Sequence, residues 1–195
     1  MRLEVLERGH KRPARLFIGF AQLLFRQRMD NVALTAMHRP EFWGRPFFAL
    51  GTTVLRGPSF WTAGEREYMA MVTSGLNECP FCIRVHTETT RIEAHGEVSV
   101  VDASLMRAEL AAVLPLLERV TKDPESLGPA DVDAVRAAGV PDEAIVDALH
   151  VSLLFNTVNR MANAFDWSWD SQEHVLVAAR MIHRISYRLP GFALR

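Results

Sequence analysis

The residues best suited to chemistry lie near the middle of the chain, where Cys79, Cys82 and His86 form the pattern C-x-x-C-x-x-x-H. On an α-helix each residue advances by about 100°, so the three side chains share one face, with Cys82 and His86 one turn apart. A cysteine attacks as its thiolate, and a neighbouring histidine can accept the thiol proton. A second cysteine nearby can resolve a sulfenic acid by forming a disulfide. The pattern therefore predicts thiol redox chemistry.

The element that carries these side chains is predicted to be a helix that begins beside the first cysteine and runs to about Ala94. Pro80 is typical of the first helical position, because its missing N–H would have no partner there, so Cys79 is expected to be the N-cap. The first turn of a helix presents unpaired N–H groups and the positive end of the helix dipole. Together with His86, these groups are expected to lower the pKa of the Cys82 thiol.

The preceding helix is predicted to supply a carboxylate. It begins at a T-x-x-E capping box, Thr62 to Glu65, and it carries Glu67. A break at Asn77 would let this helix fold back on the cysteine helix, where Glu67 could orient His86 and fix its tautomer. Spacing alone does not select Glu67 over the other nearby carboxylates, of which one is used by the capping box and two are expected to face solvent: Glu65, Glu78 and Glu88.

Helical periodicity extends along nearly the whole chain. Apolar residues recur at three- and four-residue spacing from Leu16 to Leu24, and Pro40 begins a segment that ends near Gly57. Further helices are expected at about 103–121, 129–138, 141–165 and 171–188, separated by prolines and glycines. The only strand-like run, 98–102, is too short to found a sheet. The sequence predicts one all-α domain over residues 1–195.

The composition argues against several classes of function. The 22 basic and 23 acidic residues give a formal net charge of -1, whereas a nucleic-acid partner would require a clustered basic surface. The apolar stretch Leu16 to Phe25 is well short of the roughly 20 residues that a membrane span needs. One close pair of cysteines is typical of a reducing compartment. We therefore expect a cytoplasmic protein with neither a nucleic-acid nor a membrane partner.

The spacing between the carboxylate and the cysteines resembles a family motif. From Glu67 to His86 the chain reads E, eleven residues, then C-x-x-C-x-x-x-H, which resembles the core motif of the AhpD-like alkylhydroperoxidase and carboxymuconolactone decarboxylase superfamily. Three further segments resemble its peroxidase-related branch: His38 to Glu41, Leu55 to Pro58 and Leu154 to Arg160. The resemblance covers roughly residues 30–165. In the family type case a further histidine lies between the cysteines, where this chain has Phe81.

The resemblance implies a fold, a chemistry and an assembly. The fold would be an AhpD-like helical bundle with a core of about 30–165, an N-terminal helix and a C-terminal helical extension, assembled as trimers or hexamers. Cys82 would attack a hydroperoxide, Cys79 would resolve it as a disulfide, His86 would be the base, and Glu67 would join a proton relay. A dihydrolipoamide protein or a thioredoxin-like partner would restore the dithiol, and no metal or organic cofactor is required.

Other interpretations of the same residues remain open. Zinc is one, with ligands drawn from Cys79, Cys82, His86 and either Glu67 or His95. The cysteines could also form a regulatory redox switch, or simply fill the core. A decarboxylase-type lyase would share the fold without depending on the paired cysteines. Elsewhere, Asn156, Asn159 and Arg160 share a helix face and are expected to make buried hydrogen bonds or to bridge subunits, or else to bind a substrate or partner. Three histidines are expected at the surface: His10, His174 and His183.

Overall fold

The computed structural model describes residues 1–188, except for the side chain of Ala103, and these residues form an all-α fold without a β-strand. The first half of the chain supplies six helices: α1 (Val5–Arg8), α2 (Arg12–Phe25), α3 (Asn31–His38), α4 (Arg45–Arg56), α5 (Ala63–Leu76) and α6 (Pro80–Glu93). The second half supplies four: α7 (Ala108–Lys122), α8 (Pro129–Ala137), α9 (Asp142–Phe165) and α10 (Gln172–Ile185). The predicted fold class is confirmed.

Local sequence signals place the helices around the cysteines as expected. Thr62 and Glu65 form the capping box of α5: Thr62 Oγ1 accepts from Glu65 N at 3.2 Å, and Glu65 Oε2 accepts from Thr62 N at 2.9 Å. Cys79 is the N-cap of α6, with Pro80 in its first turn. The segment that begins at Pro40 differs from the expectation, because a π-helical turn over Pro40–Gly44 precedes α4.

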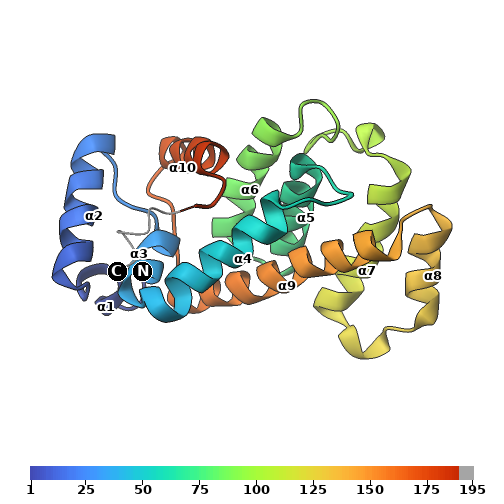
Figure 1. Ribbon diagram of the computed structural model, residues 1–195, viewed down its shortest axis with the longest axis horizontal. Coiled ribbons are helices and arrows are strands. Elements are labelled where there is room, and N and C mark those ends of the chain that lie inside the picture. Colours follow the sequence, from blue (N-terminus) through green and yellow to red (C-terminus); the bar gives the residue numbers. More distant parts are fainter. Residues whose placement is uncertain (189–195) are drawn as a thin grey trace.

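The helices α5 and α6 form a hairpin at the centre of the molecule, and they share the most extensive contact of any two elements (Figure 1). The long helix α9 lies against α5 and α7, and α10 packs on α6. Figure 1 shows α7 and α8 at one end of the molecule and α1 to α3 at the other. The hairpin therefore has neighbours from both halves of the chain.

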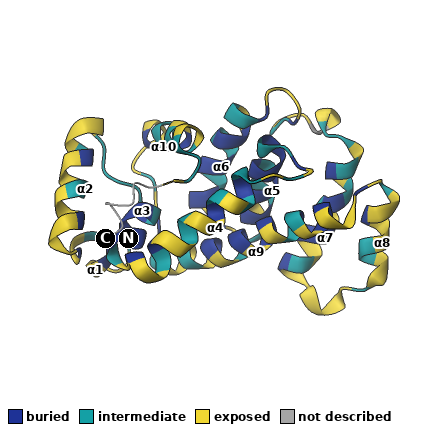
Figure 2. Cartoon of the chain, in the orientation of Figure 1, coloured by how far each residue is buried: buried dark blue, intermediate teal, exposed yellow. Residues whose placement is uncertain are grey.

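The core is apolar and centres on this hairpin, whereas α2 is largely exposed (Figure 2). Trp61, Leu55 and Met69 are among its fully buried side chains. Gly64 permits a close approach, because a β-carbon there would lie 2.5 Å from the Cα of Ala94, just beyond the end of α6. The start of α5 and the end of α6 can therefore meet only with glycine at this position.

Two expected surface histidines lie in the interior instead. His10 is 6% exposed and its Nε2 lies 2.9 Å from the carbonyl oxygen of Leu34, while His174 is 5% exposed. His183 is exposed, as predicted. The polarity of a histidine and of its sequence neighbours favours a surface position. His10 and His174 are buried instead, because elements distant in the sequence pack against them. Within residues 1–188, no helix has the length and apolar character that crossing a membrane would require.

Candidate active site

The α5–α6 hairpin brings the predicted carboxylate and imidazole together. Glu67, on α5, is fully buried, and its Oε2 lies 2.7 Å from His86 Nδ1 on α6. A carboxylate only accepts hydrogen bonds, so Nδ1 carries the donated hydrogen and Nε2 holds the lone pair in the neutral ring. Sequence spacing did not show which nearby glutamate contacts His86. The structure shows that it is Glu67, in the geometry that fixes a histidine tautomer.

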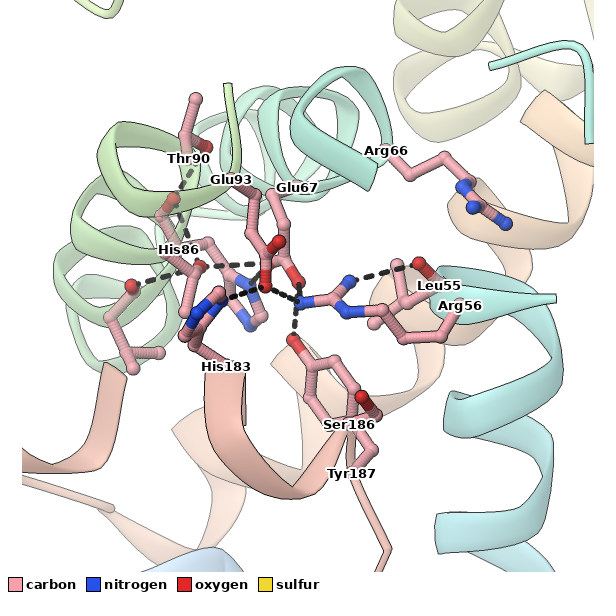
Figure 3. A network of polar contacts seen from close by, with 12 residues as sticks. Leu55, Arg56, Arg66, Glu67, His86, Thr90, Glu93, His183, Ser186 and Tyr187 are labelled. Carbon is pink, nitrogen blue, oxygen red and sulfur yellow. Dashed lines mark hydrogen bonds and ion pairs between the residues drawn. The ribbon is translucent and has the colours of Figure 1, made fainter. Parts of the chain in front are cut away.

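Three further side chains bind the same carboxylate, and Figure 3 labels two of them, Arg56 and Tyr187. Thr89 Oγ1, on α6, donates to Glu67 Oε2 at 2.8 Å. Tyr187 Oη, just after α10, donates to Glu67 Oε1 at 2.8 Å. Arg56 Nη2, at the end of α4, forms an ion pair with the same Oε1 at 2.7 Å. Both carboxylate oxygens are thus fully used by partners from α4, α6 and the segment after α10.

This environment keeps Glu67 ionised. Burial by itself would raise the pKa of Glu67, but the hydrogen bond and charge of His86, the Arg56 guanidinium and the Thr89 hydroxyl outweigh it and lower the pKa from 4.5 to about 2. A carboxylate with such a pKa does not accept a proton near neutral pH. The geometry therefore suits Glu67 to orienting His86 and stabilising its protonated form, as in other base–orienter pairs, rather than to relaying protons.

The partners of Glu67 belong to a wider polar network that reaches the surface at His183. Arg56 Nη2 also binds Glu93 at 2.9 Å, and His183 Nδ1 lies 3.1 Å from the same Glu93 oxygen. The guanidinium carbon of Arg56 lies 5.1 Å from the centre of the Tyr187 ring. Burial, followed by the nearby charge of Glu67, raises the pKa of Tyr187, so its hydroxyl stays protonated as a donor.

Sequence analysis did not select Arg56, Thr89 or Tyr187. Arg56 lies in the segment Leu55 to Pro58, which resembles the peroxidase-related branch of the family. A charged residue in such a segment could have marked Arg56 as a candidate site residue. Tyr187 lies beyond the matched range of 30–165, and only tertiary packing brings it to α5.

The two cysteines are buried and form no disulfide, but their surroundings differ. Cys82, 3% exposed, lines a cavity together with His86, whereas Cys79 is fully buried and does not line it. A hydrogen bond from Cys82, together with backbone N–H groups of Cys82 and Phe81 and the Asn159 side chain, lowers the pKa of Cys79 to about 7. Donation to Cys79, followed by burial, raises the pKa of Cys82. The lowered pKa therefore belongs to Cys79 rather than to Cys82, chiefly because Cys82 donates its hydrogen bond to Cys79, with a further contribution from the N–H groups in the first turn of the helix.

Aromatic side chains occupy the place where the family type case has a second histidine. Phe81, between the cysteines, stacks on Trp169 with ring centres 4.3 Å apart, and Trp169 Nε1 donates to the Phe81 carbonyl at 2.8 Å. Trp167 packs edge-on against Phe81 at 5.5 Å. The chain after α9, outside the matched range, therefore forms part of the wall beside the cysteines.

The cavity at Cys82 and His86 has a volume of about 140 Å³. Its walls are mostly aromatic and aliphatic, and the largest contributors come from α4, α6, α9 and the segment after it: Phe47, Phe48, Phe81, Phe155, Trp167 and Trp169. Phe155 also packs edge-on against the His86 ring at 4.6 Å. Cys82 and His86 thus line a mostly apolar space, which suits an organic molecule with a reactive polar group.

Buried amides from α9 support the turn that carries Cys79. Asn77 Nδ2 donates to Asn156 Oδ1 at 3.0 Å and to Asn159 Oδ1 at 3.2 Å. Asn159, which is fully buried, donates to Ser74 Oγ at 3.0 Å. The prediction of a buried hydrogen bond is confirmed for Asn159, whereas Asn156 is half-buried and Arg160 is exposed. The two amides tie α9 to the end of α5.

The zinc interpretation gains no support from this geometry. Among the described residues 1–188, no three or more His, Cys, Asp or Glu side chains are grouped so as to hold a metal ion. His95, one of the proposed ligands, is exposed in the loop after α6. Of the other carboxylates considered, Glu78 is exposed in the α5–α6 turn, and Glu65 is ion-paired with Arg107.

The fold and the spaced motif resemble those of AhpD-like, peroxidase-related proteins. No family model matches the sequence, and no curated protein matches it significantly. Among solved structures, an uncharacterized peroxidase-related protein from Silicibacter sp. TM1040 is similar at 22% identity, with a TM-score of 0.72 over 89% of this chain and 93% of that one. A second such protein, from Ralstonia eutropha JMP134 and described as an alkylhydroperoxidase AhpD core, is 27% identical, with a TM-score of 0.70 over 92% of this chain and 96% of that one. These structures confirm the predicted AhpD-like all-α fold and support the family resemblance seen in the sequence.

Proposed function

We propose that the protein is a thiol-dependent peroxidase that reduces organic hydroperoxides. The observation that carries this proposal is that Cys82 and His86 line one apolar cavity while the buried carboxylate of Glu67 holds His86 Nδ1 at 2.7 Å. Nucleophile, base and orienter are the three groups that an activated thiol requires. Cys79, one helical turn before Cys82, supplies the resolving thiol.

The first half-reaction oxidises Cys82. His86 Nε2 takes the Cys82 proton, and the thiolate attacks the terminal oxygen of the hydroperoxide. The O–O bond breaks, the sulfur becomes a sulfenic acid, and the departing alkoxide takes the proton from His86 and leaves as an alcohol. The ionised Glu67 stabilises the imidazolium that exists between these two proton transfers.

The second half-reaction restores the thiols. The Cys79 thiolate attacks the sulfur of Cys82; the S–O bond breaks, and the hydroxide leaves as water after taking up a proton. The Cys79–Cys82 disulfide is then reduced by an external dithiol, which supplies two electrons and two protons. We propose a dihydrolipoamide protein or a thioredoxin-like partner as this donor, and no metal or organic cofactor.

The test is dithiol-dependent consumption of cumene hydroperoxide by the wild type, Cys82→Ser and Cys79→Ser. We expect the wild type to turn over, Cys82→Ser to lose at least about a hundredfold in rate because the nucleophile is gone, and Cys79→Ser to accumulate a sulfenic acid that dimedone traps. A wild-type rate equal to that of the free dithiol would contradict the proposal.

Assembly is a separate prediction. The resemblance implies a trimer or a hexamer, and light scattering coupled to gel filtration measures the number of subunits directly. A monomeric protein would contradict this prediction without affecting the proposed chemistry, because Glu67, Cys79, Cys82 and His86 all come from one hairpin.

A further inference from the structure

A second and larger cavity lies beside the first. Its volume is about 340 Å³, and α2, α3 and α10 enclose it. The wall from α2 is a row of apolar side chains at helical spacing: Phe17, Phe20, Ala21, Leu24 and Phe25. Phe20 and Leu24 are each 62% exposed even though they face this cavity. The protein therefore keeps an unfilled apolar surface directly behind its candidate active site.

The two cavities share one wall. Five residues line both of them: Asp30, Ala33, Ala178, Met181 and Ile185. Two of them are alanines, whose small side chains make the wall between the cavities thin. Methionine is unbranched and readily changes its conformation. A thin and adaptable partition therefore separates the space at Cys82 from the space along α2.

The sizes of the cavities limit what each can hold. An apolar protein cavity of roughly 150 Å³ accommodates a molecule the size of benzene, so the 140 Å³ at Cys82 holds the reacting end of a substrate and little more. Ligand sites generally occupy about 300–1,000 Å³, a range that the second cavity reaches by itself. A substrate longer than a phenyl group must extend past the shared wall toward α2.

We propose that the two cavities form one acyl-chain channel and that the substrate class is the hydroperoxides of long-chain lipids. The hydroperoxide group lies at Cys82 and His86, and the hydrocarbon tail passes Ala178 and Met181 to lie along α2. A bound tail covers Phe20 and Leu24, and the transfer of this apolar surface from water supplies binding free energy. The substrate assignment rests on the proposed peroxidase function; the channel itself can be tested without turnover.

Binding of stable lipids to the full-length protein provides the test. Isothermal titration calorimetry would compare 13-hydroxyoctadecadienoic acid, the alcohol product of a lipid hydroperoxide, with octanoic acid. We expect the eighteen-carbon probe to bind at least about tenfold more tightly. Ala178→Phe, which fills the shared wall, should remove this preference for the longer chain.

Adjacent residues of α2 provide a matched pair of variants. Leu24 lines the second cavity, whereas Leu23, which is 79% exposed, does not. Leu24→Gln should weaken binding of the eighteen-carbon probe about tenfold, because it places an amide against the hydrocarbon chain, and Leu23→Gln should leave it unchanged. Both positions are exposed enough to accept glutamine without loss of folding.

The outcomes separate the channel from the peroxidase chemistry. Equal affinity for the two chain lengths, or equal effects of Leu23→Gln and Leu24→Gln, would overturn the channel even if cumene hydroperoxide is reduced. Chain-length-dependent binding that is sensitive to Leu24 but occurs without turnover would retain the channel and overturn the lipid hydroperoxide as substrate.

Discussion

The two sides of His86 differ sharply in chemistry. On the Nδ1 side, Glu67 is fully buried and its oxygens bind His86, Thr89, Tyr187 and Arg56 at 2.7 to 2.8 Å. On the other side, a cavity of mostly aromatic and aliphatic side chains contains the Cys82 thiol. On the Glu67 side, a carboxylate with all its hydrogen-bonding positions occupied holds the imidazole in place. On the Cys82 side, the cavity leaves space for a substrate.

This contrast shows how one helical hairpin can hold His86 rigidly on one side and present a reactive thiol on the other. A buried charge is stable only when its hydrogen-bonding capacity is satisfied, so the polar side tolerates little change. The apolar side offers few polar partners to a ligand, and Cys82 and His86 are among them, which favours placement of a reactive polar group beside these two residues. Substitutions on the polar side should therefore affect stability, and those on the apolar side should affect binding and turnover.

The largest effect on the polar side is expected from Glu67→Gln. The folded-state pKa of Glu67, about 2, lies below its ordinary value of 4.5, so ionised Glu67 stabilises the fold above pH 4.5, and this contribution is lost as the pH falls toward 2. The shift corresponds to about 3 kcal/mol in the free energy of unfolding. Urea unfolding at a series of pH values should show this loss in the wild type and not in Glu67→Gln.

The control for this experiment is Glu143→Gln, at an exposed carboxylate in the first turn of α9. It should retain the wild-type pH dependence. If Glu67→Gln retained it as well, the fourfold binding of Glu67 would not be a source of stability, and the contrast between the two sides of His86 would be lost.

A somewhat smaller effect, on the ionisation of a thiol, is expected at the cysteines. The pKa of Cys79 is lowered from 9.0 to about 7, chiefly by the hydrogen bond from Cys82. Ultraviolet absorbance of the thiolate should therefore rise around pH 7 in the wild type, and this transition should be absent from Cys79→Ser. In Cys82→Ala, which removes the hydrogen bond from the Cys82 side chain, the midpoint should rise. An unchanged midpoint would assign the lowering of the Cys79 pKa to the backbone N–H groups and Asn159.

The smallest effect is expected from Tyr187→Phe, which removes one of four partners of Glu67. A hydrogen bond to a charged group contributes about 2 kcal/mol, and Arg56, Thr89 and His86 remain in place. Thermal unfolding should show a loss of this size, and turnover should fall severalfold because His86 is held less firmly. Tyr68→Phe, on α5, controls for the loss of a phenol hydroxyl elsewhere; an equal effect there would contradict a specific role for Tyr187.

Local signals predicted the chemistry-bearing hairpin well. The helix starts at Thr62 and at Cys79-Pro80 depend only on interactions within a few residues. They could therefore be inferred without knowing which other helices pack nearby. The same locality explains the errors. His10 and His174 are buried by distant elements, and the cysteine pKa values depend on which sulfur donates to the other.

The sequence by itself determined the helical class, the E-to-C-x-x-C-x-x-x-H spacing and the common face of Cys79, Cys82 and His86, because each depends on helical periodicity and caps. Only the tertiary structure decided that Arg56 and Tyr187 meet Glu67, that Trp169 stacks on Phe81 and that two cavities share a wall. Arg56 lies 11 positions before Glu67 and Tyr187 lies 120 positions after it. Contacts at such separations follow from how whole helices pack, which no local pattern encodes.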